Sequence, residues 1–246
     1  MSSDNIGFTK ENLDRCLAAL GKEFRKRNGT AMPAELVLIG GAAVLENYGF
    51  RDRTYDVDAI IQASSAMKEA ANHVGDIMGL PTDWLNMDFI RTSSYTPKLL
   101  EHSVYYRTFS NILTIRTVRA EYLIAMKLVA GRGYKNDLSD VVGILMEHQE
   151  NGNPIGMEQI DKALHNLYGG WDAVSQDTQL FIKDVFSNGD YEALYSKYRE
   201  EEKENKAALL DFDRNYPGQL KSEKIDSILK SARARKQRKE QDPDSR

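Results

Sequence analysis

Two aspartates one residue apart, Asp56 and Asp58, are the residues of this chain best suited to hold a metal ion. They lead into a short apolar run, 59–61, that is typical of a buried strand. Because side chains repeat every second residue along a strand, we expect both carboxylates to point to the same side. Two carboxylates this close repel each other unless a cation lies between them, and hard divalent ions prefer carboxylate oxygens. The pair therefore predicts a site for Mg²⁺ or Mn²⁺.

A double glycine, Gly40-Gly41, follows a strand-length apolar run at 36–39 and precedes the aspartate pair. Glycine lets the backbone turn sharply and approach a ligand closely. A turn that opens a helix, here expected from Ala42 to Tyr48, points N–H groups and the positive end of the helix dipole at an anion. Each motif alone also fits a plain turn or a solvated strand edge. Their order and spacing favour a nucleoside triphosphate site, with a phosphate cradle on one strand and a metal pair on the next.

This combination resembles the nucleotidyltransferase superfamily, whose polymerase-beta-like fold places a Gly-Gly or Gly-Ser turn after one strand and Asp-x-Asp on the next. It is similar to the bacterial branch that includes AbiEii-type toxins, in which Arg or Lys, Thr and Asp-hydrophobic-Asp follow one another, as they do over 53–58. The resemblance covers 35–145. It implies an α/β (α+β) fold with a mixed sheet flanked by helices and a C-terminal helical region. It also implies a set of nucleotide-binding residues: Gly40, Gly41, Ala42, Arg53, Thr54 and Lys127.

Further motif residues lie between 119 and 147. Apolar residues at helical spacing surround Lys127 and end at Gly131, and a second helix begins near Asp137. By the resemblance, Lys127 and either Asp137 or Asp140 belong to the catalytic site, where the lysine would offset the charge of a triphosphate. From the residues alone, Lys127 is equally a surface lysine, and the two acids equally stabilise a helix N-terminus.

Two features depart from the family pattern. Many members have a serine after the glycine, whereas this chain has Gly41-Ala42, so backbone amides alone would hold the phosphate. A third carboxylate often completes the superfamily site from a later strand, but the strand expected at 111–118 contains no acid. Asp88 is the candidate third metal ligand, with Asn86 as another residue that could face the metal. We expect Trp84, in the same segment, to anchor the loop on the core.

The flanking sequence supplies the elements that would position these residues. A capped helix from Thr9 to about Lys26 precedes the first strand, and a helix over 66–78 follows the second, so the order of elements favours a mixed α/β layer. We expect a nucleotidyltransferase-like domain over 1–150, a helical region over 151–230, and a basic, flexible tail over 231–246. The helical region would close over the site or bind a partner, and the tail could contact RNA phosphates.

Composition narrows the class of protein. With 41% hydrophobic and 28% charged residues, the chain is typical of a globular protein rather than a disordered or membrane-embedded one. No signal segment or bilayer-length apolar run is evident, so we expect a cytoplasmic protein with no membrane partner. The single cysteine, Cys16, is expected to be buried on a helix face, and the four histidines lack ligand spacing.

These observations favour a Mg²⁺-dependent nucleotidyltransferase that transfers NMP from an NTP to an acceptor hydroxyl. By resemblance, the acceptor would be RNA, such as a tRNA 3′ end, and the protein a toxin with a cognate antitoxin protein. A protein hydroxyl is the alternative acceptor. The rival hypothesis is a catalytically silent relative that binds nucleotide or a partner protein, which the absent serine and the unassigned third acid support.

Overall fold

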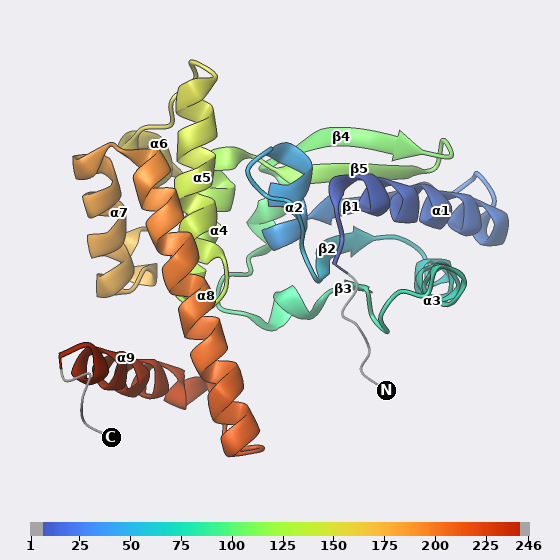
Figure 1. Ribbon diagram of the computed structural model, residues 1–246. Helices are drawn as coiled ribbons and strands as arrows, with labels where there is room; N and C mark the ends of the chain where they lie inside the picture. The colour runs from blue at the N-terminus through green and yellow to red at the C-terminus, as the bar shows by residue number, and fades with distance from the viewer. Residues whose placement is uncertain (1–6, 242–246) are drawn as a thin grey trace.

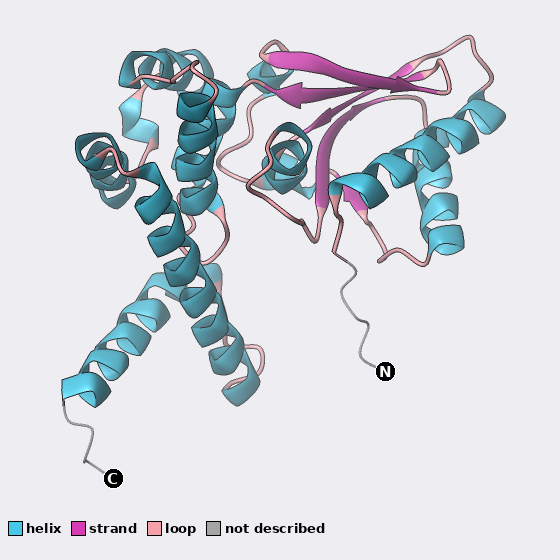
Figure 2. Ribbon diagram, turned by 45° about the horizontal axis from the view of Figure 1, so that its top comes forward, coloured by secondary structure: helices cyan, strands magenta, loops and turns pink. Residues whose placement is uncertain are grey.

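The computed structural model describes residues 7–241. Within them, a mixed sheet with the strand order β3-β2-β1-β5-β4 lies on one side of the molecule and most of the later helices on the other (Figures 1 and 2). The strands are β1 (Ala34–Leu38), β2 (Val57–Gln62), β3 (Leu85–Asn86), β4 (Ser103–Phe109) and β5 (Leu113–Val118). The central strand β1 pairs antiparallel with β2 and parallel with β5. The α/β fold with a mixed sheet is therefore confirmed.

The helices of the first 150 residues alternate with these strands. They are α1 (Lys10–Asn28), α2 (Gly40–Asn47), α3 (Ala66–Met78), α4 (Ala120–Ala130) and α5 (Asp137–Glu150). Short 3-10 turns cover Asp88–Arg91 and Pro97–Leu100. Thr9 caps α1 through a reciprocal pair of hydrogen bonds with Asn12, which is the N-terminal signal that the sequence carries. Helices α1 and α3 pack against each other beside the sheet (Figure 1).

The remaining chain is helical throughout. Its helices are α6 (Met157–Tyr168), α7 (Gln176–Asn188), α8 (Tyr191–Asn215) and α9 (Ile225–Gln241), with 3-10 turns at Trp171–Ala173 and Ser222–Lys224. The flexible tail expected from 231 is helical to Gln241, because Ala, Arg, Lys, Gln and Glu all favour helix. Residues 242–246 lie outside the described residues, as do the side chains of Arg233, Arg235, Lys236, Arg238 and Lys239. Contact between the tail and RNA stays a prediction.

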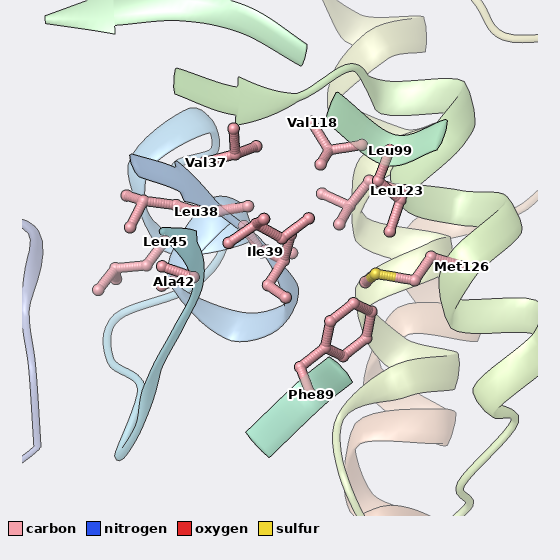
Figure 3. Packing of buried hydrophobic residues seen from close by; sticks show 14 of the residues in the cluster. Val37, Leu38, Ile39, Ala42, Leu45, Phe89, Leu99, Val118, Leu123 and Met126 are labelled. Atoms are coloured by element: carbon pink, nitrogen blue, oxygen red, sulfur yellow. The ribbon is translucent and has the colours of Figure 1, made fainter. Parts of the chain in front are cut away.

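The core lies where β1 meets α2 and α4. Figure 3 shows Ile39, directly after β1, between Ala42 and Leu45 of α2 on one side and Leu123 and Met126 of α4 on the other. Two predictions for buried residues are confirmed. Cys16 is 1% exposed, and Trp84 is buried with its indole N–H donating to the Ala71 carbonyl at 3.0 Å. The edge strand β4 was not predicted.

Across residues 7–241, no helix has both the length and the apolar character that crossing a membrane requires.

Candidate functional site

The glycine turn and the aspartate pair meet because β1 and β2 are antiparallel neighbours. Strand β1 ends at Leu38 opposite Ala59, and the N–H of Ile39 donates to the Asp58 carbonyl at 3.0 Å. Gly40 then opens α2 with φ of +55°, a conformation that favours glycine. A Cβ added to Gly40 would lie 3.6 Å from the Asp58 carboxylate. The end of β1 is thus brought to the start of β2, with an acid beside the turn.

Local contacts orient both acids of the pair. Asp56 lies one residue before β2 rather than on it. The buried Thr54 donates its hydroxyl to the carbonyl and the carboxylate of Asp56, at 3.2 and 3.3 Å. Strand β3 runs parallel to β2 and sets Asn86 opposite Asp58, where its side chain acts to lower the pKa of the carboxyl group. Both carboxylates line one cavity.

The electrostatics of the pair suit a bound cation. Burial and the neighbouring Asp56 raise the pKa of Asp58 to about 6, although Lys135 and Arg132 act to lower it. A carboxylate held back from ionising by burial and by a like charge is the environment that a divalent ion relieves. The residues present therefore fit Mg²⁺ or Mn²⁺ through two hard oxygen ligands and an amide neighbour.

The structure does not add Asp88 to this pair. Among the described residues, no group of three His, Cys, Asp or Glu side chains is placed to hold a metal ion. Asp88 lies on the cavity rim with its side chain 79% exposed and 3.9 Å from Arg91. Strand β3 ends at Asn86, and Asp88 begins the 3-10 turn that follows. The role of Asp88 as third ligand stays a prediction, and Asn86 is the residue paired with Asp58 across the two strands.

Lys127 belongs to a buried ion-pair network rather than to the surface. Because β5 is parallel to β1, the helix α4 that follows β5 starts at the same end of the sheet as the glycine turn. The Lys127 ammonium lies 2.7 Å from Asp140 and 3.3 Å from Asp137. Arg132 pairs with Asp137 at 2.7 Å, and Arg51 donates to Asp140. Three cations thus hold two carboxylates.

This ion-pair network joins α4 to the start of α5 beside the cavity. Lys127, Asp137 and Asp140 are each 4% exposed or less. Burial acts to raise the pKa of Asp137, but Lys127 and Arg132 outweigh it and the pKa is lowered. Removing one member of such a network leaves a buried unpaired charge, which costs about 3–5 kcal/mol. Lys127 is therefore held in place and does not have the freedom of a mobile cation beside a triphosphate.

The cavity is lined by an arginine other than the one predicted to bind nucleotide. Arg53, expected to bind nucleotide, does not line the cavity; its side chain is exposed and lies against Gly7. Arg51 lines the cavity instead, and its Nε donates to the Arg53 carbonyl at 3.1 Å. Ala42 is buried in the core, so only its backbone amide is suited to an anion. The loop has no periodicity that could have distinguished the two arginines from sequence.

A cavity of about 810 Å³ joins the aspartate pair to the ion-pair network. One wall carries the glycine turn, the two acids and the segment after α4. The opposite wall is α8, which contributes Arg199, Lys203 and Lys206 among others. Glu202 of α8 reaches past this wall to accept hydrogen bonds from the N–H of Leu138 at 2.8 Å and the hydroxyl of Ser139 at 2.5 Å. Helix α8 of the helical region thus lines the same cavity as the aspartate pair, and closure of this region over a functional site stays a prediction.

Comparison of the sequence with protein families finds one family model that matches it. Residues 15–150 match the model of a family described as "nucleotidyltransferase of unknown function (DUF6036)". The chain belongs to the DUF6036 family. The matched segment contains the glycine turn, the aspartate pair and the ion-pair network, whereas α8 lies beyond it. The match supports the nucleotidyltransferase superfamily and does not distinguish the AbiEii-type branch. No curated protein and no solved structure matches.

In this DUF6036 chain, most of the residues singled out from sequence line one cavity: Gly40, Gly41, Thr54, Asp56, Asp58, Lys127, Asp137 and Asp140. Asn86 and Asp88, which sequence reasoning named as residues that could face the metal, also line it, whereas Arg51, Arg132 and Lys135 line it and were missed. Arg132 and Lys135 line the cavity with Asp58 and act to lower its pKa, so they are cations close to the aspartate pair. Their position after Gly131, which ends α4 in a left-handed conformation, is the signal that places them in a loop.

Proposed function

We propose that this protein is a nucleotidyltransferase that moves NMP from an NTP to an acceptor hydroxyl with the help of Mg²⁺ or Mn²⁺. The observation that supports this most is the pair of acids beside the glycine turn, in a cavity that also holds cations. Asp56 and Asp58 would hold the ion, which when bound supplies charge stabilisation for the attacking and leaving oxygens of the phosphoryl transfer. Thr54 and Asn86 orient the two carboxylates for this task.

The polyphosphate would lie between the glycine turn and the loop after α4. The first N–H groups of a helix have no partner within it, so those of Gly41 and Ala42 face an anion at the turn. Arg132 is 35% exposed on its side chain and, with Lys135, lies near Asp58. These two residues would neutralise the phosphates, which is the task that the resemblance gives to Lys127. Lys127 would act as a positioning residue through Asp137 and Asp140.

The acceptor hydroxyl would attack the α-phosphorus as the bond to pyrophosphate breaks. We propose RNA as the acceptor, with a protein hydroxyl as the alternative. The roles of toxin and cognate antitoxin, and a cytoplasmic location, rest on the sequence alone.

The second candidate function is a silent relative that binds nucleotide without transfer. The observation that favours it is the lack of a third carboxylate beside Asp56 and Asp58 among the described residues. The two hypotheses differ in pyrophosphate release, because only the enzyme breaks a phosphoanhydride bond. A silent form would bind NTP and release none with any acceptor.

The test is incubation of the purified protein with labelled NTPs, MgCl₂ and total RNA. We expect labelled RNA, or labelled protein if the acceptor is a protein hydroxyl. The Asp56→Asn/Asp58→Asn double variant should lose about 10²-fold or more of this labelling. Asp184→Asn, an exposed acid on α7, is the matched control and should label like the parent. Labelling by the double variant at the parent's rate would overturn the proposal.

A further inference from the structure

Helix α8 contains a charged run, 199–206, whose signs are separated by helix face. Successive residues of an α-helix are rotated by about 100°, so positions 199, 203 and 206 fall within an arc of about 60°. Three acids, Glu200, Glu201 and Glu204, fall outside this arc, at about 100° to 200° around the helix from position 199. The three cations line the cavity, and the three acids do not. In sequence the run looks like a solvated mixture of charges, but folded it presents a cationic wall: Arg199, Lys203 and Lys206.

The two acids closest to this cationic wall, Glu202 and Glu200, do not prevent its cations from binding another anion. Glu202 also lies on the cavity side, but its carboxylate is buried and accepts hydrogen bonds from Leu138 and Ser139. Lys203 lies 3.0 Å from Glu200, with the two side chains 62% and 64% exposed. A pair this exposed contributes little and exchanges readily for another anion.

An exposed aromatic ring lies across from this wall. Tyr55 stands between Thr54 and Asp56, lines the cavity and is 44% exposed. The ammonium of Lys206 lies 5.3 Å from the centre of its ring. Proteins that bind single-stranded nucleic acid combine aromatic rings, on which bases stack, with cations that follow the phosphates. Both components occur here within one cavity and directly beside a proposed metal ligand.

We infer that α8 and Tyr55 form the subsite for a single-stranded RNA acceptor. The terminal nucleobase stacks on Tyr55, and the preceding phosphates bind Arg199, Lys203 and Lys206. Positions 199 and 206 are about 10 Å apart along the helix, which suits successive phosphodiesters better than one phosphate group. The triphosphate of the donor has its own cations, Arg132 and Lys135, on the facing wall.

The assignment of this strand as acceptor rests on the proposed function, but its binding does not. The test is therefore binding of a fluorescein-labelled single-stranded RNA to the full chain, in EDTA and without NTP. Lys203→Gln/Lys206→Gln should weaken binding about tenfold and reduce the slope of log K against log[salt] by about 1.4, because each phosphate that a cation neutralises on a single strand contributes about 0.7 to this slope. The control Lys183→Gln/Lys197→Gln removes two exposed cations that do not line the cavity, and should leave the slope unchanged.

Tyr55→Ala tests the stacking component. We expect it to weaken binding about tenfold for any terminal base, with the salt slope retained, whereas Tyr55→Phe should bind like the parent. Undiminished affinity of the Lys203→Gln/Lys206→Gln variant, or equal affinity of the parent for duplex RNA, would overturn the inference.

A further arm distinguishes the acceptor from the donor nucleotide. MgATP binding, measured by calorimetry, should be the same in the parent and in Lys203→Gln/Lys206→Gln. If ATP binding falls while RNA binding persists, the wall belongs to the NTP and the inference is wrong. Because the RNA assay contains no metal and no NTP, its failure leaves nucleotidyl transfer to another acceptor intact. Loss of the proposed activity, in turn, would leave the RNA subsite standing.

Discussion

Gly41 shows how a missing side chain determines the candidate site. A Cβ at this position would lie 2.5 Å from the Thr54 hydroxyl and 2.9 Å from the Arg51 guanidinium. Thr54 in turn orients Asp56, and Arg51 pairs with Asp140. A side chain at position 41 therefore has no room here. The space it would take is filled by Thr54 and Arg51, which connect the aspartate pair to the ion-pair network.

We expect Gly41→Ala to destabilise the protein by about 1–3 kcal/mol, because Thr54 and Arg51 must both shift to admit the methyl group. Helix propensity alone would give the opposite sign, since alanine is better than glycine in a helix by about 1 kcal/mol. Urea unfolding measures the difference. Gly49→Ala is the matched control, because its nearest neighbour would be 3.8 Å away, and it should be neutral or slightly stabilising. A Gly41→Ala variant as stable as the parent would contradict this account of the turn.

At the scale of helices and strands, the elements that sequence predicts are those whose signals are local. The capping pair at Thr9 and the glycine that ends α3 lie within one turn of the ends they define. Strand β4 escaped prediction because it is an edge strand that exposes Val104 and Tyr105, and a register shift after Tyr105 breaks its alternation. Only the two ends of β4, Ser103 and Phe109, are buried, so the strand carries no alternating apolar pattern.

The contacts that complete the candidate site are long-range, which is why its outline was predictable and its detail was not. The apolar stripe of α4 predicts the helix but not that Lys127 is buried against Asp137 and Asp140. The hydrogen bond from Leu138 to Glu202 spans 64 positions of the chain. No local pattern indicates that Glu202, one of several acids in the charged run 199–206, is the one that is buried.

Glu202 makes the junction between α5 and α8 sensitive to pH. Its carboxyl group accepts the N–H of Leu138 at the start of α5, and burial raises its pKa from 4.5 to about 8. Between these values the folded chain binds a proton that the unfolded chain releases. The contribution of Glu202 to stability is therefore full below about pH 4.5 and is lost as the pH rises toward 8.

Glu202→Gln keeps an acceptor oxygen and removes the titration. Relative to the parent, we expect this variant to become more stable between pH 5 and pH 8.5, by on the order of 2–4 kcal/mol. Glu202→Ala keeps no acceptor and should lose about 1–2 kcal/mol at low pH, as other lost caps do. Urea unfolding at several pH values measures both. A constant difference between Glu202→Gln and the parent across this range would show that the carboxyl group is ionised throughout.

At the scale of the whole molecule, the family-matched segment and the helical region share one core. Within the described residues, a single cluster of buried apolar side chains extends from Phe8 to Tyr198. Helix α4 packs on α6, and α5 packs on α8. Helices from before and after the boundary expected at residue 150 therefore pack directly against each other. The cavity lies between the same two parts and is lined by both. A chain built this way gains its site only when both parts are folded.

The two tryptophans of the chain test whether these parts unfold together. Trp84 is buried beside α3, and Trp171 lies between α6 and α7, where its indole donates to Asp161 at 2.7 Å. Trp84→Phe and Trp171→Phe leave one fluorescent reporter in each part. Because the parts share a core, we expect fluorescence and far-ultraviolet circular dichroism to report one urea midpoint within each variant. Comparing two signals from the same variant controls for the hydrogen bond that each substitution removes. Separate midpoints would show that the helical region folds on its own and that α8 can leave the cavity without unfolding the sheet.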